Sequence, residues 1–280
     1  MGLAVLFCIQ CRNLISGWAT PTKAPGLGAT PAVAEPAQAP TETTNYQDPI
    51  DRMAHESPLE LLREAQRRYR DSVVDYTCYF TKQENLYGRM TAVQGAQVRF
   101  RAQPFSVFMH WVQNPDKARR VCYVAGKWTT KDGEPAALCE PEGAIARAFI
   151  SKILRPIHGA EAKAASRRTI DQFGFASTLD LIIKYSLIAQ QRGELKLTHL
   201  GDGEVDGRPT YVFERRLPYT GEGGEYPDRV LVYHLDKETL LPVLCASYAD
   251  EAKQELLGQY MYTRVQLNIG LTDAHFEGVD

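Results

Sequence analysis

The chain has 280 residues, of which 44% are hydrophobic and 24% are charged, and its formal net charge is −2. A chain of this length and composition can bury a substantial core, which excludes a protein that is disordered throughout. Its arginine pairs are spread along the sequence instead of forming one basic block, which excludes the charge pattern of a nucleic-acid-binding protein. We therefore expect one β-rich domain of about 230 residues behind a tail.

The N-terminus carries a short apolar segment. Residues 2–11 (GLAVLFCIQC) match the length of a signal-peptide core and are too few for a membrane-spanning helix of roughly 20 residues. Small residues at Gly17 and Ala19 are typical of a cleavage site, although no Lys or Arg precedes the apolar run. The pattern predicts a leader over 1–19 and an exported protein of the periplasm or envelope.

The next segment, 20–49, is rich in Pro, Ala and Thr and nearly free of large apolar residues. Such a segment buries too little apolar surface to offset the conformational entropy that it would lose on ordering, so we expect an extended linker there. The linker is either a spacer that holds the domain away from a membrane or a tail without a role. The folded domain is expected over 50–280.

The first regular element is a helix over 57–71. Ser57 is suited to the N-cap, Pro58 to the first helical position, and Glu60 completes a capping box. Strand-like alternation follows over 74–81, and three further strands are expected over 93–102, 106–113 and 118–125 with short turns between them. Such spacing predicts an antiparallel meander.

One of these strands is apolar on both faces. Val107, Met109 and Trp111 lie on one face, and Phe108 and Val112 lie on the other. Both sides of this strand must therefore be covered.

The middle of the chain changes to a helical period. Two helices are expected over 143–156 and 177–190, with apolar stripes formed by Ile145, Phe149, Ile153 and Leu154 in the first and Leu179, Ile182, Ile183, Ser186 and Leu187 in the second.

Strands then resume over 194–200, 209–217, 229–235, 241–249 and 254–269. The helices do not separate the strands one by one, which excludes a parallel βαβ arrangement. The expected fold class is mainly β (α+β).

The search for catalytic and metal motifs is negative. The six histidines are dispersed without an HExxH pair, and no GxSxG, GxxxxGK[ST] or GxGxxG stretch occurs. A hydrolase would have to use carboxylates such as Glu84 and Glu140, and their spacing does not support one. We therefore predict no enzyme activity, no catalytic or metal-binding residues and no cofactor.

Two acidic, glycine-containing stretches are interpreted as turns or loops. DGEVDG (202–207) has calcium-loop spacing, but Phe213 stands where a bidentate Glu is needed, so a hairpin turn is expected. GEGGEYPD (221–228) is either a solvated loop or a gate at the mouth of a cavity.

Four cysteines lie in the domain: Cys78, Cys122, Cys139 and Cys245. They permit two disulfides in three connectivities, or free thiols. Three of them sit within strand patterns, so buried thiols are predicted for at least two. A further CxxC lies in the apolar leader without a second pair, which disfavours a zinc or redox site.

Five ordered stretches resemble the bacterial family called domain of unknown function 1571, from about residue 57 to 277: YTCYFTKQE (76–84), VRFRAQPFSVFMHW (98–111), TIDQFGF (169–175), DKETLLPV (236–243) and NIGLTDAHF (268–276). This family is similar in layout to the outer-membrane lipoprotein carriers (LolA-like proteins) and to the sensor domain of periplasmic regulators of envelope stress.

The resemblance implies a curved, half-open antiparallel β-barrel with an N-terminal helix and two lid helices inserted between the strand groups. In such a fold a central strand faces the lid helices on its concave side and a neighbouring segment on its convex side. An apolar cavity for acyl chains is then lined by Phe80, Phe100, Val107, Met109, Trp111, Phe149, Ile153, Ile183 and Leu187. The alternative is a core that the same helices fill completely.

The predicted function is that of a monomeric, non-catalytic envelope protein that binds a lipid or an acylated protein. Release of the ligand would require the lid helices to move. The alternative is a module that binds an envelope protein or senses envelope stress, with a filled core and no ligand.

Overall fold

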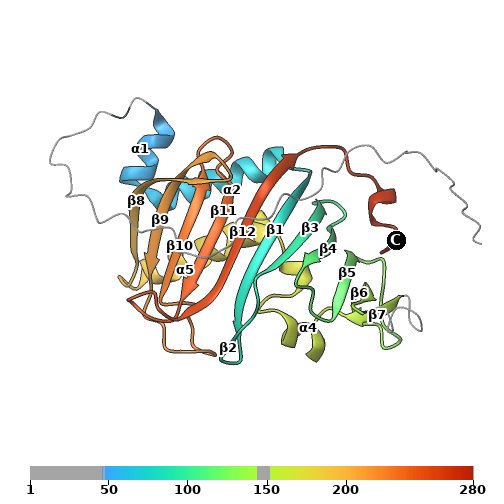
Figure 1. Ribbon diagram of the computed structural model, residues 1–280. Helices are drawn as coiled ribbons and strands as arrows, with labels where there is room; N and C mark the ends of the chain where they lie inside the picture. The colour runs from blue at the N-terminus through green and yellow to red at the C-terminus, as the bar shows by residue number, and fades with distance from the viewer. Residues whose placement is uncertain (1–45, 47, 144–151, 280) are drawn as a thin grey trace, which may run out of the picture. The chain divides into compact units, whose positions relative to one another are not determined.

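An open antiparallel sheet of 12 strands dominates the computed structural model, which describes residues 46, 48–143 and 152–279 (Figure 1). The strand order is β7-β6-β5-β4-β3-β1-β12-β11-β10-β9-β8, and β2 pairs with β1 outside this path. Because β7 and β8 end the sheet without pairing with each other, the barrel is not closed. The predicted fold class, mainly β with a half-open antiparallel sheet, is confirmed.

The strands are β1 (Asp75–Leu86), β2 (Arg89–Met90), β3 (Gln94–Arg101), β4 (Ser106–Gln113), β5 (Ala118–Val124), β6 (Ala136–Pro141), β7 (Ile153–Pro156), β8 (Lys196–Val205), β9 (Arg208–Arg216), β10 (Val230–Asp236), β11 (Pro242–Tyr248) and β12 (Leu256–Leu267). The helices are α1 (Pro49–Glu56), α2 (Pro58–Ser72), α4 (Ala160–Ala165) and α5 (Phe175–Gln191), with 3-10 turns η1 (Ile170–Gln172) and η2 (Asp273–Phe276).

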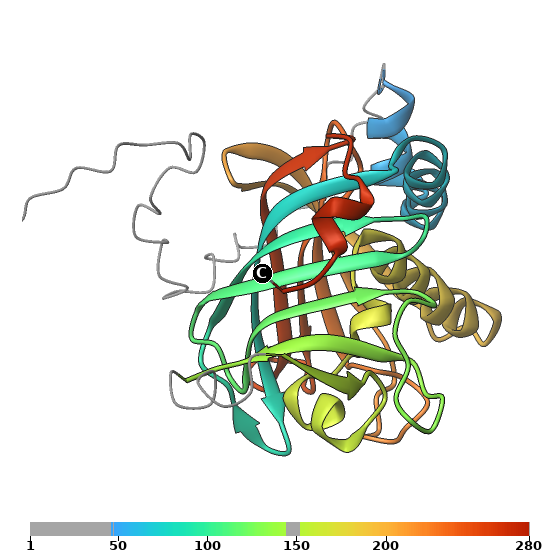
Figure 2. The same cartoon turned by 90° about the vertical axis from the view of Figure 1, so that its right-hand side faces the viewer.

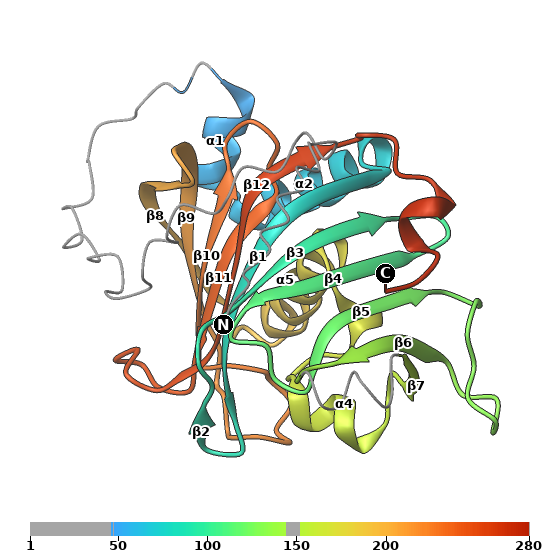
Figure 3. The same ribbon diagram turned by 45° about the vertical axis from the view of Figure 1, so that its right-hand side comes forward.

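The sheet consists of two meanders, β1 to β7 and β8 to β12, that meet where β1 pairs with β12. Figures 2 and 3 show the sheet bending around α5, which lies in the hollow. Helix α2 lies beside α5 at the edge of this hollow, where Gln66 Nε2 donates a 2.5 Å hydrogen bond to Asp180 Oδ1. The N-terminal helix and the second lid helix are therefore as predicted, with α5 beginning at Phe175.

The main core fills the concave side of the sheet under α2 and α5. Alternation puts Tyr76, Phe100 and Val107 side by side on this face, because β1, β3 and β4 pair in register at these residues. All three are almost fully buried, together with Leu62 of α2 and Leu179 of α5. Burial of each such side chain contributes about 1.5 to 3 kcal/mol, so this cluster holds the helices in the hollow.

Helix α5 begins where the chain passes close to the sheet. Gly174 has φ 107°, a conformation that favours glycine, and a Cβ atom there would come within 2.8 Å of the Tyr76 hydroxyl oxygen. The glycine therefore allows η1 to lead into α5 directly above the aromatic residues of the core.

Strand β4, which is apolar on both faces, is covered on its convex side by the C-terminal strap, which we define as residues 268–279. Phe108 packs against Leu271, Phe276 and Val279 of the strap. The expectation that helices cover one face of this strand and a neighbouring segment covers the other is confirmed for Phe108, whereas Val112 remains 43% exposed.

The start of the strap is fixed by one buried carboxylate at the beginning of β1. Asp75 accepts hydrogen bonds from the backbone N–H groups of Ile269, Gly270 and Leu271 at 2.8, 3.2 and 3.0 Å. Because three donors converge on one ionisable group, the direction of the strap is set as it leaves β12.

The helix predicted over 143–156 is wrong at its C-terminal end. Ile153 and Leu154 lie in strand β7, which pairs with Cys139 and Leu138 of β6. Residues 144–151, which include Ile145 and Phe149, lie outside the described residues. Adjacent apolar residues such as Ile153 and Leu154 fit a short strand as well as a helix. Here they form a strand because they pair with the edge of β6.

The remaining differences are additions. Helix α1 precedes the predicted first helix, and Asp48 caps it by accepting a hydrogen bond from the Ile50 N–H at 2.7 Å. Strand β6 and helix α4 were also not predicted. DGEVDG forms a hairpin turn as expected, with Asp206 and Gly207 at positive φ, but β8 runs on to Val205 before the turn.

All four cysteines of the domain are free, and Cys78, Cys122 and Cys245 are buried. The prediction of at least two buried thiols is therefore confirmed. Burial raises the pKa of Cys139, which is half-buried in β6, to about 11. The thiols are accordingly protonated and unreactive at neutral pH.

Acid sensitivity is expected from His234 in β10, which is 7% exposed and lies 3.0 Å from the Thr210 hydroxyl oxygen. Burial lowers the pKa of His234 to about 4. In the unfolded chain His234 has its ordinary pKa of about 6.5. At pH values between about 6.5 and 4 the unfolded chain therefore binds a proton that the folded chain does not. The free energy of unfolding falls as the pH drops through this range, by up to about 3 kcal/mol.

Urea unfolding of the His234→Gln variant across this pH range checks the expectation. The variant should show a shallower loss of stability in acid than the wild-type protein, because glutamine does not titrate. His158→Gln is the matched control, because it makes the same substitution at a side chain that is 54% exposed. Equal profiles for all three proteins would contradict the assignment.

Candidate ligand pocket

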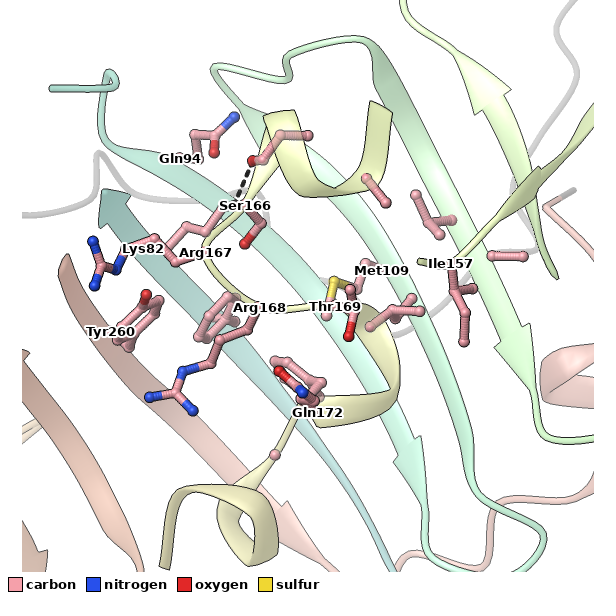
Figure 4. A pocket seen from close by; sticks show the side chains of 18 of the residues that line it. Lys82, Gln94, Met109, Ile157, Ser166, Arg167, Arg168, Thr169, Gln172 and Tyr260 are labelled. Atoms are coloured by element: carbon pink, nitrogen blue, oxygen red, sulfur yellow. Dashed lines mark hydrogen bonds between the residues drawn. The ribbon is translucent and has the colours of Figure 1, made fainter. Parts of the chain in front are cut away.

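A pocket of about 390 Å³ lies between the concave face of the sheet and the segment that runs from β7 to the start of α5 (Figure 4). Its sheet side is formed by β1 and β3 to β6, and β9 to β12 contribute from the other meander. Ligand pockets of proteins commonly measure about 300 to 1,000 Å³. The hollow of the sheet is therefore not filled completely, and the space is large enough for part of a lipid.

Four of the nine residues predicted to bind the ligand line this pocket: Phe80, Met109, Trp111 and Ile153. They share the concave face because Phe80 and Trp111 both pair with Ala96 across neighbouring strands.

The other five residues lie elsewhere. Phe100, Val107 and Ile183 are buried in the main core under α5, and Leu187 packs half-buried against that core. Phe149 lies outside the described residues. The concave face is thus divided, with one end filled by α5 and the other end open as the pocket, a division that strand alternation alone does not reveal. The role of all nine residues in binding stays a prediction.

Aromatic side chains surround the centre of the pocket. The Phe80 ring lies edge-on to Phe173 at 5.1 Å between centroids, and Tyr262 and Tyr260 lie at 5.0 and 6.4 Å from it. Edge-to-face and offset contacts of this kind fix ring orientations. They give the pocket a rigid wall instead of a collapsible one.

A fully buried carboxylate stands beside this wall. Glu84 accepts hydrogen bonds from Lys82 Nζ at 2.7 Å, the Tyr260 hydroxyl at 2.7 Å, the Ser166 hydroxyl at 3.1 Å and the Arg167 backbone N–H at 3.1 Å. Burial alone would raise the pKa of Glu84, but these donors and the Lys82 charge outweigh it and hold the pKa below its ordinary value. Glu84 is therefore ionised and is a structural anchor.

That anchor holds the rim segment, which we define as residues 166–169 between α4 and η1. Two of the four donors to Glu84 belong to it, and Lys82 Nζ also donates to the Ala165 carbonyl oxygen at 3.3 Å just before it. All four residues of the rim segment line the pocket. The sequence analysis considered Glu84 only as a hydrolase acid and missed this role, because its partners other than Lys82 lie 82 to 176 residues away.

A second buried ion pair lines the pocket from the other meander. Arg215 Nη2 lies 3.1 Å from the Asp228 carboxylate, and Arg215 Nη1 donates to the Ile182 carbonyl oxygen at 3.1 Å. The two side chains are only 2% and 6% exposed. Arg215 Nε is buried and has no hydrogen-bond partner in the part of the chain that the structure describes. In the sequence, only an arginine doublet and an acidic loop mark the positions of this pair.

The glycine-rich loop over 221–228 borders the pocket. Pro227 and Asp228 line it, and Glu222 Oε1 lies 3.5 Å from Arg167 Nη1 of the rim segment. This loop is therefore placed next to the cavity, as the gate interpretation requires, although its movement stays a prediction.

Within the described ranges, no three or more His, Cys, Asp or Glu side chains are grouped so as to hold a metal ion. No helix in the same ranges combines the length and the apolar character needed to cross a bilayer.

The family model for proteins of unknown function called DUF1571 matches residues 73–279. The chain belongs to this family. The resemblance stated from the five sequence stretches is thus confirmed. No curated protein matches the sequence.

Several solved structures are similar to this chain. The MucB chain in the Pseudomonas aeruginosa MucA/MucB complex is 16% identical, with a TM-score of 0.42, over 79% of this chain and 61% of that chain. The Mycobacterium tuberculosis lipoprotein LppX is 11% identical, with a TM-score of 0.39, over 78% and 98%. A LolA superfamily protein of Nitrosomonas europaea is 8% identical, with a TM-score of 0.27, over 77% and 96%.

Proposed function

We propose that this protein is a non-catalytic binding protein that holds the acyl chain of a lipid or of an acylated protein in the pocket. The observation that carries the proposal is the open, largely apolar space next to a tightly filled core in the same hollow. A sheet and helices that served only as a scaffold would gain stability by closing this space, because voids forfeit packing energy.

The energetics of chain burial support useful affinity. Each methylene group that leaves water contributes about 0.8 kcal/mol, so six of them contribute about 5 kcal/mol before the cost of immobilising the chain. The aromatic wall around Phe80 is already in place, so little further ordering of the protein is needed.

We further propose that the domain over 50–280 works as a monomer in the periplasm or envelope, behind a leader and a linker. The apolar run over 2–11 and the Pro, Ala and Thr content of 20–49 support this arrangement.

Val121→Trp is expected to block the pocket and weaken binding of a fluorescent fatty-acid analogue at least tenfold in a titration. Val121 is half-buried in β5, pairs with Met109 and lines the cavity, so the larger indole must enter the space that the chain would occupy. Loss of two or more buried methylene contacts already corresponds to about tenfold in affinity.

The matched control is Val112→Trp, which makes the same substitution on the neighbouring strand. Val112 is 43% exposed and lies on the opposite face from Trp111, so binding should not change. If the wild-type protein binds no acyl probe, or if both variants bind like the wild type, the proposal fails. The alternative of a protein-binding or sensing module without a ligand would then be favoured.

A further inference from the structure

The charge of the pocket lining differs from that of the whole chain. Whereas the chain has a formal net charge of −2, the lining has six cationic side chains and three carboxylates: Lys82, Lys117, Arg155, Arg167, Arg168 and Arg215 against Asp116, Glu161 and Asp228. A mainly apolar cavity that needed only to accept hydrocarbon would not require this excess of positive charge.

Three of the cations are neutralised by ion pairs at 2.7 to 3.2 Å: Lys82 with Glu84, Arg215 with Asp228 and Arg155 with Glu161. The two arginines of the rim segment are different. Among the residues that the structure describes, the Arg167 guanidinium has only the 3.5 Å contact with Glu222, whose side chain is 66% exposed. Arg168 has no hydrogen bond or ion pair within the described parts of the chain.

These two arginines are held at the pocket by the rim segment. The Glu84 carboxylate binds the backbone N–H of Arg167, so the position of the segment is fixed although the guanidinium groups are not. Arg168 extends beside Tyr260 (Figure 4). Burial raises the pKa of Tyr260, and the positive charge of Arg168 opposes that rise, which places this charge near the aromatic wall.

The pocket is therefore amphipathic along its length. Arg167, Arg168 and Tyr260 lie on one side of Figure 4, and Met109 and Ile157 lie on the other. An acyl chain fits the apolar end, and the cationic end remains for the group to which that chain is attached.

We propose that the ligand is an anionic amphiphile, in which a headgroup oxyanion is bound by Arg167 and Arg168 while the acyl chain occupies the apolar end. The proposal rests on the proposed function and adds the chemical class of the headgroup. Arginine presents a planar set of donors that binds phosphate or carboxylate oxygen atoms in pairs. The exposed Glu222 carboxylate would yield its place at Arg167 to such a group.

The experiment compares three probes with the full chain below the micelle concentration of the lipids: 1-palmitoyl-lysophosphatidylglycerol, 1-palmitoylglycerol and glycerol 3-phosphate. The first two carry the same acyl chain on glycerol and differ in the anionic phosphoglycerol headgroup of the first. We expect the lysophospholipid to bind at least tenfold more tightly than the uncharged lipid, and glycerol phosphate alone to bind more weakly than either.

The variants assign this preference to the rim segment. In the Arg167→Gln/Arg168→Gln double variant the tenfold preference should disappear, while the affinity for 1-palmitoylglycerol stays unchanged. Arg168→Lys keeps the charge and should retain part of the preference. Arg192→Gln is the matched control, because Arg192 is exposed, pairs with Glu225 and does not line the pocket.

The outcomes separate this inference from the proposed function. If both lipids bind equally well and the double variant changes neither, the inference is overturned and acyl-chain binding stands. If neither lipid binds, acyl-chain binding itself fails. If glycerol phosphate binds as tightly as the lysophospholipid, the arginines form a site for a free phosphate, and the inference is overturned as well. Unchanged thermal unfolding of the variants confirms that each is folded.

Discussion

The Asp228→Asn variant is expected to lose about 3 to 5 kcal/mol in its free energy of unfolding, measured by urea denaturation at neutral pH. Removal of one partner of a buried ion pair leaves the other charge uncompensated, which costs this much in proteins. The Arg215 side chain is only 2% exposed, so water cannot readily take the place of the carboxylate.

Glu225→Gln is the control for this prediction. Glu225 lies in the same loop and pairs with Arg192, but the two side chains are 50% and 46% exposed. Exposed pairs of this kind contribute less than about 1 kcal/mol. A loss of less than about 1 kcal/mol in both variants would show that water in the pocket solvates Arg215, and that the pair is not a structural requirement.

Glu84→Gln is expected to lower the free energy of unfolding by about 3 kcal/mol, since it leaves Lys82 buried without its counter-charge. The sign of the pH dependence follows from the lowered pKa of Glu84. The ion pair stabilises the wild-type protein at neutral pH, and this contribution is lost as the pH falls through the folded-state pKa. The wild-type and variant proteins should therefore converge in stability in acid.

The same variant should also make the rim segment more mobile. A measurement of the free energy of unfolding does not detect this local change. Trypsin cleaves after arginine, so digestion at Arg167 and Arg168 should be faster in Glu84→Gln than in the wild-type protein under native conditions. Glu238→Gln is the control, because Glu238 pairs with Arg208 and is 79% exposed. Equal cleavage at the rim in all three proteins would contradict the anchoring role of Glu84.

Part of the fold could be predicted because strands such as β3 and β8 alternate between the two faces of the sheet. In β3, Val98 and Phe100 are buried while Arg99 and Arg101 are half-buried, so periodicity gives both the element and its inner face. The prediction over 136–156 failed because the sequence there has no such alternation. Strand β6 reads AALCEP and β7 reads ILRP, and neither alternates between apolar and polar residues, so only pairing with a neighbour identifies them as strands.

The candidate site could be predicted only in its apolar part. Alternation places Phe80, Met109 and Trp111 on the inner face without an alignment. It also places Lys82 and Glu84 on that face, but polar residues at these positions indicate the exposed end of a strand, whereas both residues are buried. Their burial depends on a rim segment more than 80 residues away, and no local pattern reports such a contact.

The junction of β1 with β12 also determines when the protein can complete its fold. About 170 residues separate the end of β1 at Leu86 from the start of β12 at Leu256, whereas every other strand on the main path pairs with its neighbour in sequence. Each meander has the local contacts that favour rapid collapse, and the long-range closure at β1 is the slow step. Until β12 reaches β1, one edge of β1 is unpaired, and an unpaired strand edge favours aggregation.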